Sequence, residues 1–133
     1  MEFVKAPRSI RITGETKVHT GMCTIVNSSP DYKKFDVRVN QDCMDRWRVI
    51  EERAKGYVDC EWSSLLYDDI FRVKYDDDSM FFNQRKEIID PVIRIGTRCM
   101  MILECVSVYT FNKKSGISVR IHQCLMLDPE CVL

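Results

Sequence analysis

The sequence predicts a mainly-β protein, a small antiparallel barrel or sandwich with roughly seven or eight strands and one α-helix. Three observations lead to this prediction. A length of 133 residues suits one domain, so we treat residues 1–133 as a single binding domain. The last third has the pattern of one long two-stranded hairpin. Helical periodicity is confined to one segment, whereas a parallel α/β fold would need several helices.

The hairpin is the clearest element. Residues 98–110 are largely apolar, and residues 112–116 form a polar stretch that ends in Gly116. Two such strands joined by a polar, Gly-containing loop indicate a β-hairpin, here with Lys113 and Lys114 at its tip. Strict alternation along residues 117–127 predicts one face made of Ile117, Val119, Ile121, Leu125 and Leu127, and an opposite face made of Ser118, Arg120 and His122.

Shorter strands are expected upstream of the hairpin, because apolar and polar residues alternate there between turn-forming clusters. Turns are expected at residues 27–31 and 76–79, which are rich in Asn, Ser, Pro and Asp. The expected strands cover residues 9–12, 17–26, 33–39, 70–75 and 80–82, and residues 92–95 are expected to lead through Gly96 into the hairpin.

One helix is expected from about residue 42 to Gly56. Asp42 can cap it, Asp45 falls in the first turn, and Gly56 stands where a left-handed C-terminal residue is favoured. A single apolar stripe runs along it through Cys43, Trp47, Ile50 and Ala54.

Composition excludes several function classes. The seven cysteines are scattered without a CxxC pair, which argues against zinc and for a reducing, intracellular compartment. No apolar run approaches the roughly 20 residues needed to span a bilayer, so no membrane partner is expected. Only two histidines occur, His19 and His122, and the glycines are spread singly, so neither a catalytic constellation nor a phosphate-binding loop is seen. We therefore expect no enzyme activity and no cofactor.

Cationic strands suggest single-stranded DNA as the partner, because proteins that bind it combine a positive groove with aromatic stacking platforms. Tyr32 and Trp62 are further stacking candidates beyond the main set. The predicted binding residues are Lys33, Lys34, Arg38, Arg72, Lys74, Tyr75, Tyr109, Lys113, Lys114 and Arg120.

An acidic alternative is also present. The 20 acidic residues balance the 20 basic ones, and several cluster between residues 59 and 78 among apolar side chains. Such a surface suits a basic protein partner such as histones H3 and H4. The residues predicted for this alternative are Asp68, Asp69, Asp76, Asp77, Asp78 and Trp62.

Three segments resemble a known family. They are RVIEERAKGYVDCEW at residues 48–62, FRVKY at residues 71–75, and the stretch of residues 95–127 with Gly116 and Gln123. They are similar to the OB-fold single-stranded-DNA-binding proteins of large nucleocytoplasmic DNA viruses. A weaker likeness, in size, strand content and acidic surface, exists to anti-silencing-type histone chaperones.

The resemblance implies an OB-like barrel that binds DNA through the Lys, Arg and aromatic positions of those strands. We therefore expect a non-enzymatic viral protein that acts on DNA or chromatin in the host nucleus or cytoplasm. Single-stranded DNA binding is the first expectation, and histone H3/H4 binding is the second. Open strand edges leave room for a homodimer.

Overall fold

A computed structural model describes residues 1–7 and 9–127 of the chain. Within these residues it contains eleven strands, one α-helix and a short 3-10 helix. The expected mainly-β fold with one helix is confirmed, but the expected strand number was too low. The elements are β1 (Glu2–Lys5), β2 (Ile10–Thr13), β3 (Lys17–Ser29), η1 (Pro30–Tyr32), β4 (Lys34–Arg38), α1 (Gln41–Lys55), β5 (Glu61–Trp62), β6 (Leu66–Tyr67), β7 (Ile70–Lys74), β8 (Met80–Phe82), β9 (Ile88–Ile89), β10 (Arg98–Phe111) and β11 (Lys114–Leu127).

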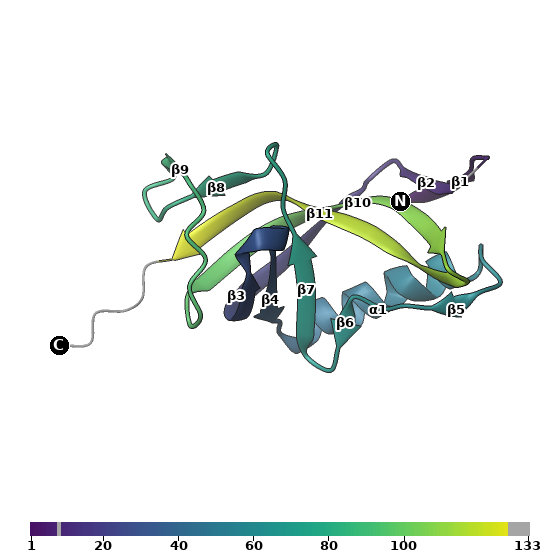
Figure 1. The fold of residues 1–133 in the computed structure, drawn as a ribbon, viewed down its shortest axis with the longest axis horizontal. Helices are drawn as coiled ribbons and strands as arrows, with labels where there is room; N and C mark the ends of the chain where they lie inside the picture. Colours follow the sequence, from purple (N-terminus) through teal and green to yellow (C-terminus); the bar gives the residue numbers. More distant parts are fainter. Residues whose placement is uncertain (8, 128–133) are drawn as a thin grey trace.

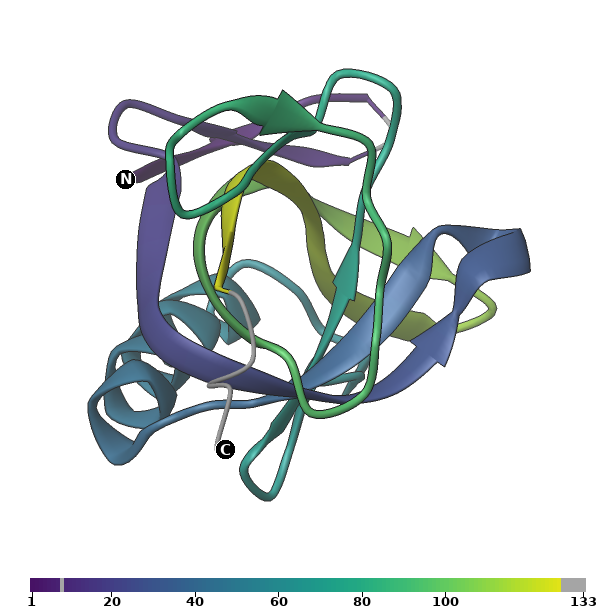
Figure 2. The same cartoon turned by 90° about the vertical axis from the view of Figure 1, so that its left-hand side faces the viewer.

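The strands form one strongly curved sheet (Figures 1 and 2). Its order is β6-β7-β4-β3-β10-β11-β8-β9, with β2 joined to β10, β1 joined to β2, and β5 joined to β11. All pairs are antiparallel except those that β11 makes with β5 and β8. Among the described strands the hydrogen-bonded order does not return to its start, so the sheet is not a closed barrel.

The excess strands are short. β5, β6 and β9 have two residues each, too few to show an alternating pattern. Residues 92–95 run as a loop before Gly96, whose φ of 93° turns the chain into β10, as expected of a segment that leads into the hairpin.

Helix α1 covers one side of the sheet and adds Cys43, Trp47 and Ala54 to a core made mainly by the strands. Trp47, which is 1% exposed, packs edge-on against Phe71 of β7, with ring centroids 4.9 Å apart. The helix is capped by Asn40, whose side chain accepts a hydrogen bond from the Cys43 backbone at 2.8 Å, and not by Asp42 as expected. Gly56 has right-handed backbone angles, so the expected left-handed terminus was also wrong.

The β10–β11 hairpin is confirmed, but its facing pattern changes midway. Ile102 pairs with Gln123 and Leu103 pairs with Ile121, so His122 is an extra residue in β11. Such a bulge moves every later side chain to the other face. The buried positions accordingly change from Ile117, Val119 and Ile121 to Cys124 and Met126, which leaves Leu125 and Leu127 half-buried on the outer face. Strict alternation to Leu127 was therefore wrong.

The hairpin tip is tighter than expected. Asn112 and Lys113 have φ of 50° and 63°, the backbone of a two-residue turn whose twist matches that of the strands. Lys114, Ser115 and Gly116, expected in the loop, belong to β11. At Gly116 a Cβ atom would lie 2.7 Å from both the Ser63 carbonyl and the Tyr109 hydroxyl, so the glycine permits this close packing.

The cysteines of the described chain behave as core residues. Cys23, Cys43, Cys99, Cys105 and Cys124 are buried, and Cys60 is exposed. Burial raises the pKa of Cys23 and of Cys105 to about 12. In the described residues no three His, Cys, Asp or Glu side chains gather as a metal site, and no helix is long and apolar enough to cross a membrane. Cys131 lies outside the described residues.

Candidate nucleic-acid interface

The outer face of β3, β4 and β7 carries two rows of polar side chains. The strand register aligns Lys34 of β4 with Lys74 of β7 and with Ser29 of β3. The next row along the strands aligns Asp36 with Arg72 and with Asn27. The residues between these rows, such as Phe35 and Val73, point inward and are 1% exposed. Alternation along β4 and β7 therefore gathers polar groups on one outer face.

Lys34 and Lys74 form an unusual pair. Both are exposed, they lie directly opposite each other, and neither makes an ion pair with any described residue. Like charges directly opposite each other on neighbouring strands destabilise a sheet. A bound anion would remove this repulsion, which makes the pair the clearest mark of a phosphate-binding surface on this face.

A hollow of about 260 Å³ lies on the same face. Tyr32, at the tip of the β3–β4 hairpin, forms one wall and is 73% exposed. Hydroxyl, amide, carboxylate and cationic groups together with an aromatic ring therefore surround one open depression. It is lined by Asn27, Ser28, Ser29, Tyr32, Lys34, Phe35, Asp36 and Arg72.

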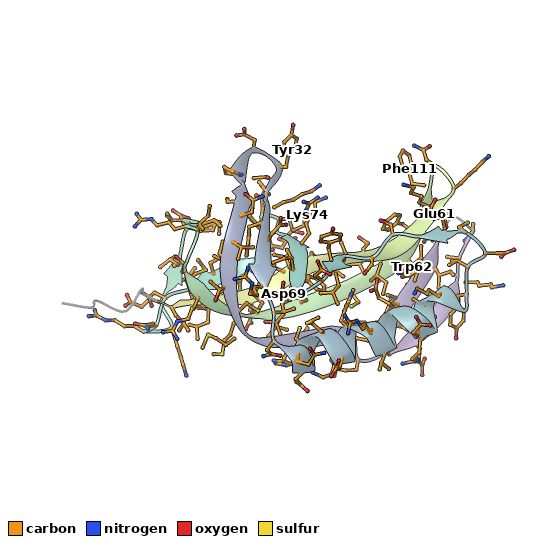
Figure 3. All side chains as sticks on the ribbon, turned by 90° about the horizontal axis from the view of Figure 1, so that it is seen from below. Tyr32, Glu61, Trp62, Asp69, Lys74 and Phe111 are labelled. Carbon is orange, nitrogen blue, oxygen red and sulfur yellow. The ribbon has the colours of Figure 1, made fainter. Side chains whose placement is uncertain are left out.

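The β10–β11 hairpin provides a second projection. Phe111, Lys113 and Lys114 are at its tip, and Phe111 is 71% exposed. Both hairpins project to the same side of the molecule, away from α1 (Figures 2 and 3). Figure 3 shows Tyr32 and Phe111 at the two tips with Lys74 between them. Lys74, its register partner Lys34 and the hairpin tip therefore border one side of the protein.

Four of the other predicted cations are already paired with carboxylates. The Lys33 Nζ lies 2.7 Å from Asp77 Oδ1, and this hydrogen bond raises the pKa of Lys33 and lowers that of Asp77. Arg72 Nε lies 3.0 Å from Asp36 Oδ1, a bond that raises the pKa of Arg72.

Arg38 and Arg120 complete this group. Arg38 Nε lies 3.2 Å from Asp69 Oδ2. Arg120 lies between Asp76 at 3.4 Å and Glu104 at 3.2 Å, on the outer face of β10 and β11. The two predicted surfaces are therefore not separate, because Asp69, Asp76 and Asp77 of the acidic set pair with Arg38, Arg120 and Lys33 of the cationic set.

The remaining acidic residues are exposed. Asp68, with φ of 53°, lies in the turn between β6 and β7, and Asp78 lies in the turn after β7. Neither makes an ion pair within the described part of the chain. Trp62, the apolar member of this set, is half-buried, and its Nε1 donates to Glu51 Oε2 at 2.8 Å.

The predicted stacking residues are mostly packed. Tyr75 lies against Phe35 and Phe81, with ring centroids 6.1 and 5.3 Å away, and Tyr109 lies across Gly116. Both tyrosines are half-buried. The open aromatic surface on this side comes from Tyr32 and Phe111 instead. Phe111 was missed as a site residue, although an aromatic residue directly before a hairpin turn has no core within reach.

A second hollow, of about 280 Å³, lies on another part of the outer surface. The bulge at His122 places Leu125 there, beside Met100 of β10. No lysine or arginine lines it, so it lacks the groups that bind phosphate. Its lining residues are His19, Gly21, Phe82, Met100, Met101, Ile102, Gln123 and Leu125.

Comparisons with known proteins identify solved structures with a similar fold. No protein-family model matches the chain, and no curated protein matches it. Among solved structures, gp2.5, a single-stranded DNA-binding protein encoded by bacteriophage T7, is similar with a TM-score of 0.64 and 14% identity, over 84% of this chain and 91% of that one. The single-stranded DNA-binding protein of bacteriophage Enc34, truncated at its C-terminus, is similar with a TM-score of 0.61 and 8% identity, over 97% and 96%. The chain thus shares the fold of two phage single-stranded DNA-binding proteins.

Proposed function

We propose that the protein binds single-stranded DNA across the side bordered by the β3–β4 and β10–β11 hairpins. The observation that carries this proposal is the opposed Lys34–Lys74 pair, which has no carboxylate partner among the described residues. Tyr32 and Phe111 flank it as exposed rings on which bases can stack. The fold of the two phage proteins supports the same ligand.

Each part of this surface has a distinct task. Lys34, Lys74, Lys113 and Lys114 contact phosphates, and these contacts are independent of sequence. Tyr32 and Phe111 hold unpaired bases, which a double helix does not expose. The protein binds without covalent chemistry, and a viral replication setting fits both the resemblance of its segments and the phage origin of its structural neighbours.

The acidic alternative has less support. Three of its five carboxylates already neutralise neighbouring cations, and Trp62 is tied to Glu51. Within the described residues only Asp68 and Asp78 of this set are free of such contacts, so a histone partner would meet two unpaired carboxylates unless it displaced the other pairs. We therefore retain one function as the proposal.

Fluorescence anisotropy with a labelled oligothymidylate tests the proposal. The wild type is expected to bind most tightly at about 50 mM salt and to weaken steeply as salt rises. The variant Lys34→Ala/Lys74→Ala should bind less tightly, with a salt slope lower by about 1.4, or 0.7 for each lost phosphate contact. Tyr32→Ala should weaken binding by about 1–3 kcal/mol, whereas Tyr32→Phe should not, because the ring remains.

A matched control removes the same charge elsewhere. Arg46→Ala/Lys55→Ala deletes two cations from α1, on the side away from the hairpin tips. This variant should bind as the wild type does. No binding by the wild type at about 50 mM salt, or an equal loss in the control, would refute the proposed interface.

A further inference from the structure

The predicted cations at the two ends of β4, Lys33 and Arg38, are paired with carboxylates of the same chain. We infer that Asp77 and Asp69 are intramolecular competitors of the DNA phosphates, each holding a cation that a phosphate would otherwise bind. This inference rests on the proposed function and concerns its regulation: the two carboxylates limit how tightly single-stranded DNA is held.

Asp77 forms an ion pair with Lys33, which directly precedes β4. Its Oδ1 lies 2.7 Å from Nζ, the position that a phosphate oxygen would take. The side chains are 95% and 49% exposed, and exposed pairs of this kind contribute little net free energy. A phosphate can therefore replace the carboxylate without loss of a buried interaction.

The carboxylate is held at this site by the turn that carries it. The Asp78 backbone N–H donates to Asp76 Oδ1 at 2.9 Å, and the Ser79 hydroxyl donates to the Ile121 carbonyl of β11. Asp76 is also paired with Arg120. These contacts fix the turn beside the interface. Asp77 is therefore held in position to compete with a DNA phosphate for Lys33.

Lys33 is fixed as well. Its φ is 52°, and its carbonyl accepts a hydrogen bond from the Tyr75 backbone at 3.0 Å. It directly precedes Lys34 in the chain, beside the opposed lysine pair. The Lys33 side chain lines a different hollow, with Tyr75 and Asp77, from the one that Lys34 lines. Release of Lys33 from Asp77 would therefore add a cation at the edge of the phosphate-binding surface.

Asp69 repeats the arrangement at the other end of β4. Its Oδ2 lies 3.2 Å from Arg38 Nε, and its backbone carbonyl accepts from the Val39 N–H at 2.8 Å. Both side chains are open, at 46% and 59% exposure. By contrast, the Asp36 side chain, paired with Arg72, is 14% exposed, so this carboxylate is less open to exchange and is not counted as a competitor.

The test measures binding of labelled oligothymidylate by wild type, Asp77→Asn and Asp69→Asn over a range of salt concentrations. Each substitution should tighten binding by up to about fivefold near 50 mM salt. Each should also steepen the salt slope by up to about 0.7, because one more cation then contacts a phosphate. Asp42→Asn is the matched control, since it removes the same charge from an exposed pair with Arg46 on α1.

A double variant separates competition from general repulsion. In Lys33→Ala/Asp77→Asn, the gain from Asp77→Asn should disappear, because the cation that it frees is gone. An equal gain in Asp42→Asn, a gain that persists without Lys33, or no gain in Asp77→Asn and Asp69→Asn would each overturn the inference while the wild type still binds. Absence of binding in every variant would instead overturn the proposed function.

Discussion

Glu51 provides a sharp test of the packing that supports the interface. It is 6% exposed, although it is a carboxylate and lies outside the apolar stripe of α1. Its Oε2 accepts from Trp62 Nε1 at 2.8 Å, and its Oε1 accepts from Ser64 Oγ at 2.6 Å. One carboxylate thus ties the helix to β5 and to the segment that leads into β6.

The expected loss on substitution follows from these two bonds. A hydrogen bond to a charged group contributes about 1.5–3 kcal/mol, but the Ser64 hydroxyl is exposed and can bond to water instead. We therefore expect Glu51→Ala to lower the free energy of unfolding by about 2–3 kcal/mol. Glu51→Gln keeps one acceptor and should lose about 1–2 kcal/mol.

Urea unfolding followed by tryptophan fluorescence measures both effects, and thermal unfolding gives an independent value. At about 3–5 °C per kcal/mol for a chain of this size, Glu51→Ala should melt roughly 10 °C below the wild type. Glu52→Ala is the neighbouring control: its carboxylate pairs with Lys55 in solvent and should matter by less than about 0.5 kcal/mol. Equal stability of Glu51→Ala and Glu52→Ala would refute this account of the helix–β5 contact.

Two further predictions concern the hairpin and the thiols. Gly116→Ala should destabilise the fold by about 1–3 kcal/mol in thermal unfolding, because the added Cβ would lie 2.7 Å from the Ser63 carbonyl; a wild-type melting temperature would contradict the packing seen there. Peptide mapping after brief alkylation at pH 8 should find Cys60 modified but Cys23 and Cys105 unmodified, since a pKa of about 12 keeps buried thiols protonated at that pH; equal labelling would contradict their burial.

The parts of the fold that sequence reasoning recovered are those with a long, regular pattern. The β10–β11 hairpin and the stripe of α1 each repeat over enough residues to be seen in the sequence. The bulge at His122 was not predictable, because an extra residue in one strand is defined only by the partner strand. The two-residue strands β5 and β9 were not predicted for the same reason, because pairing with a neighbouring strand defines them and no local sequence pattern does.

The sequence predicted which cationic residues face away from the core, but not which carboxylates pair with them. Alternation indicated that Lys34, Arg72 and Lys74 point away from the core, and the structure places all three on neighbouring strands. It could not indicate that Lys33 meets Asp77 or that Arg38 meets Asp69. These partners are 44 and 31 positions apart in the chain, and only the register of the folded sheet brings them together.

The balance of charge acquires a physical meaning from this arrangement. A net charge of zero argues against a nucleic-acid binder when charges are counted over the whole chain. Association with DNA depends instead on the cations that phosphates can reach and on the carboxylates that compete for them. Here Lys34 and Lys74 stand opposite each other, and Asp77 and Asp69 lie in exposed, exchangeable pairs at the two ends of β4. A net charge of zero is therefore compatible with the proposed DNA binding, and the exchangeable ion pairs favour binding that is reversible and sensitive to salt.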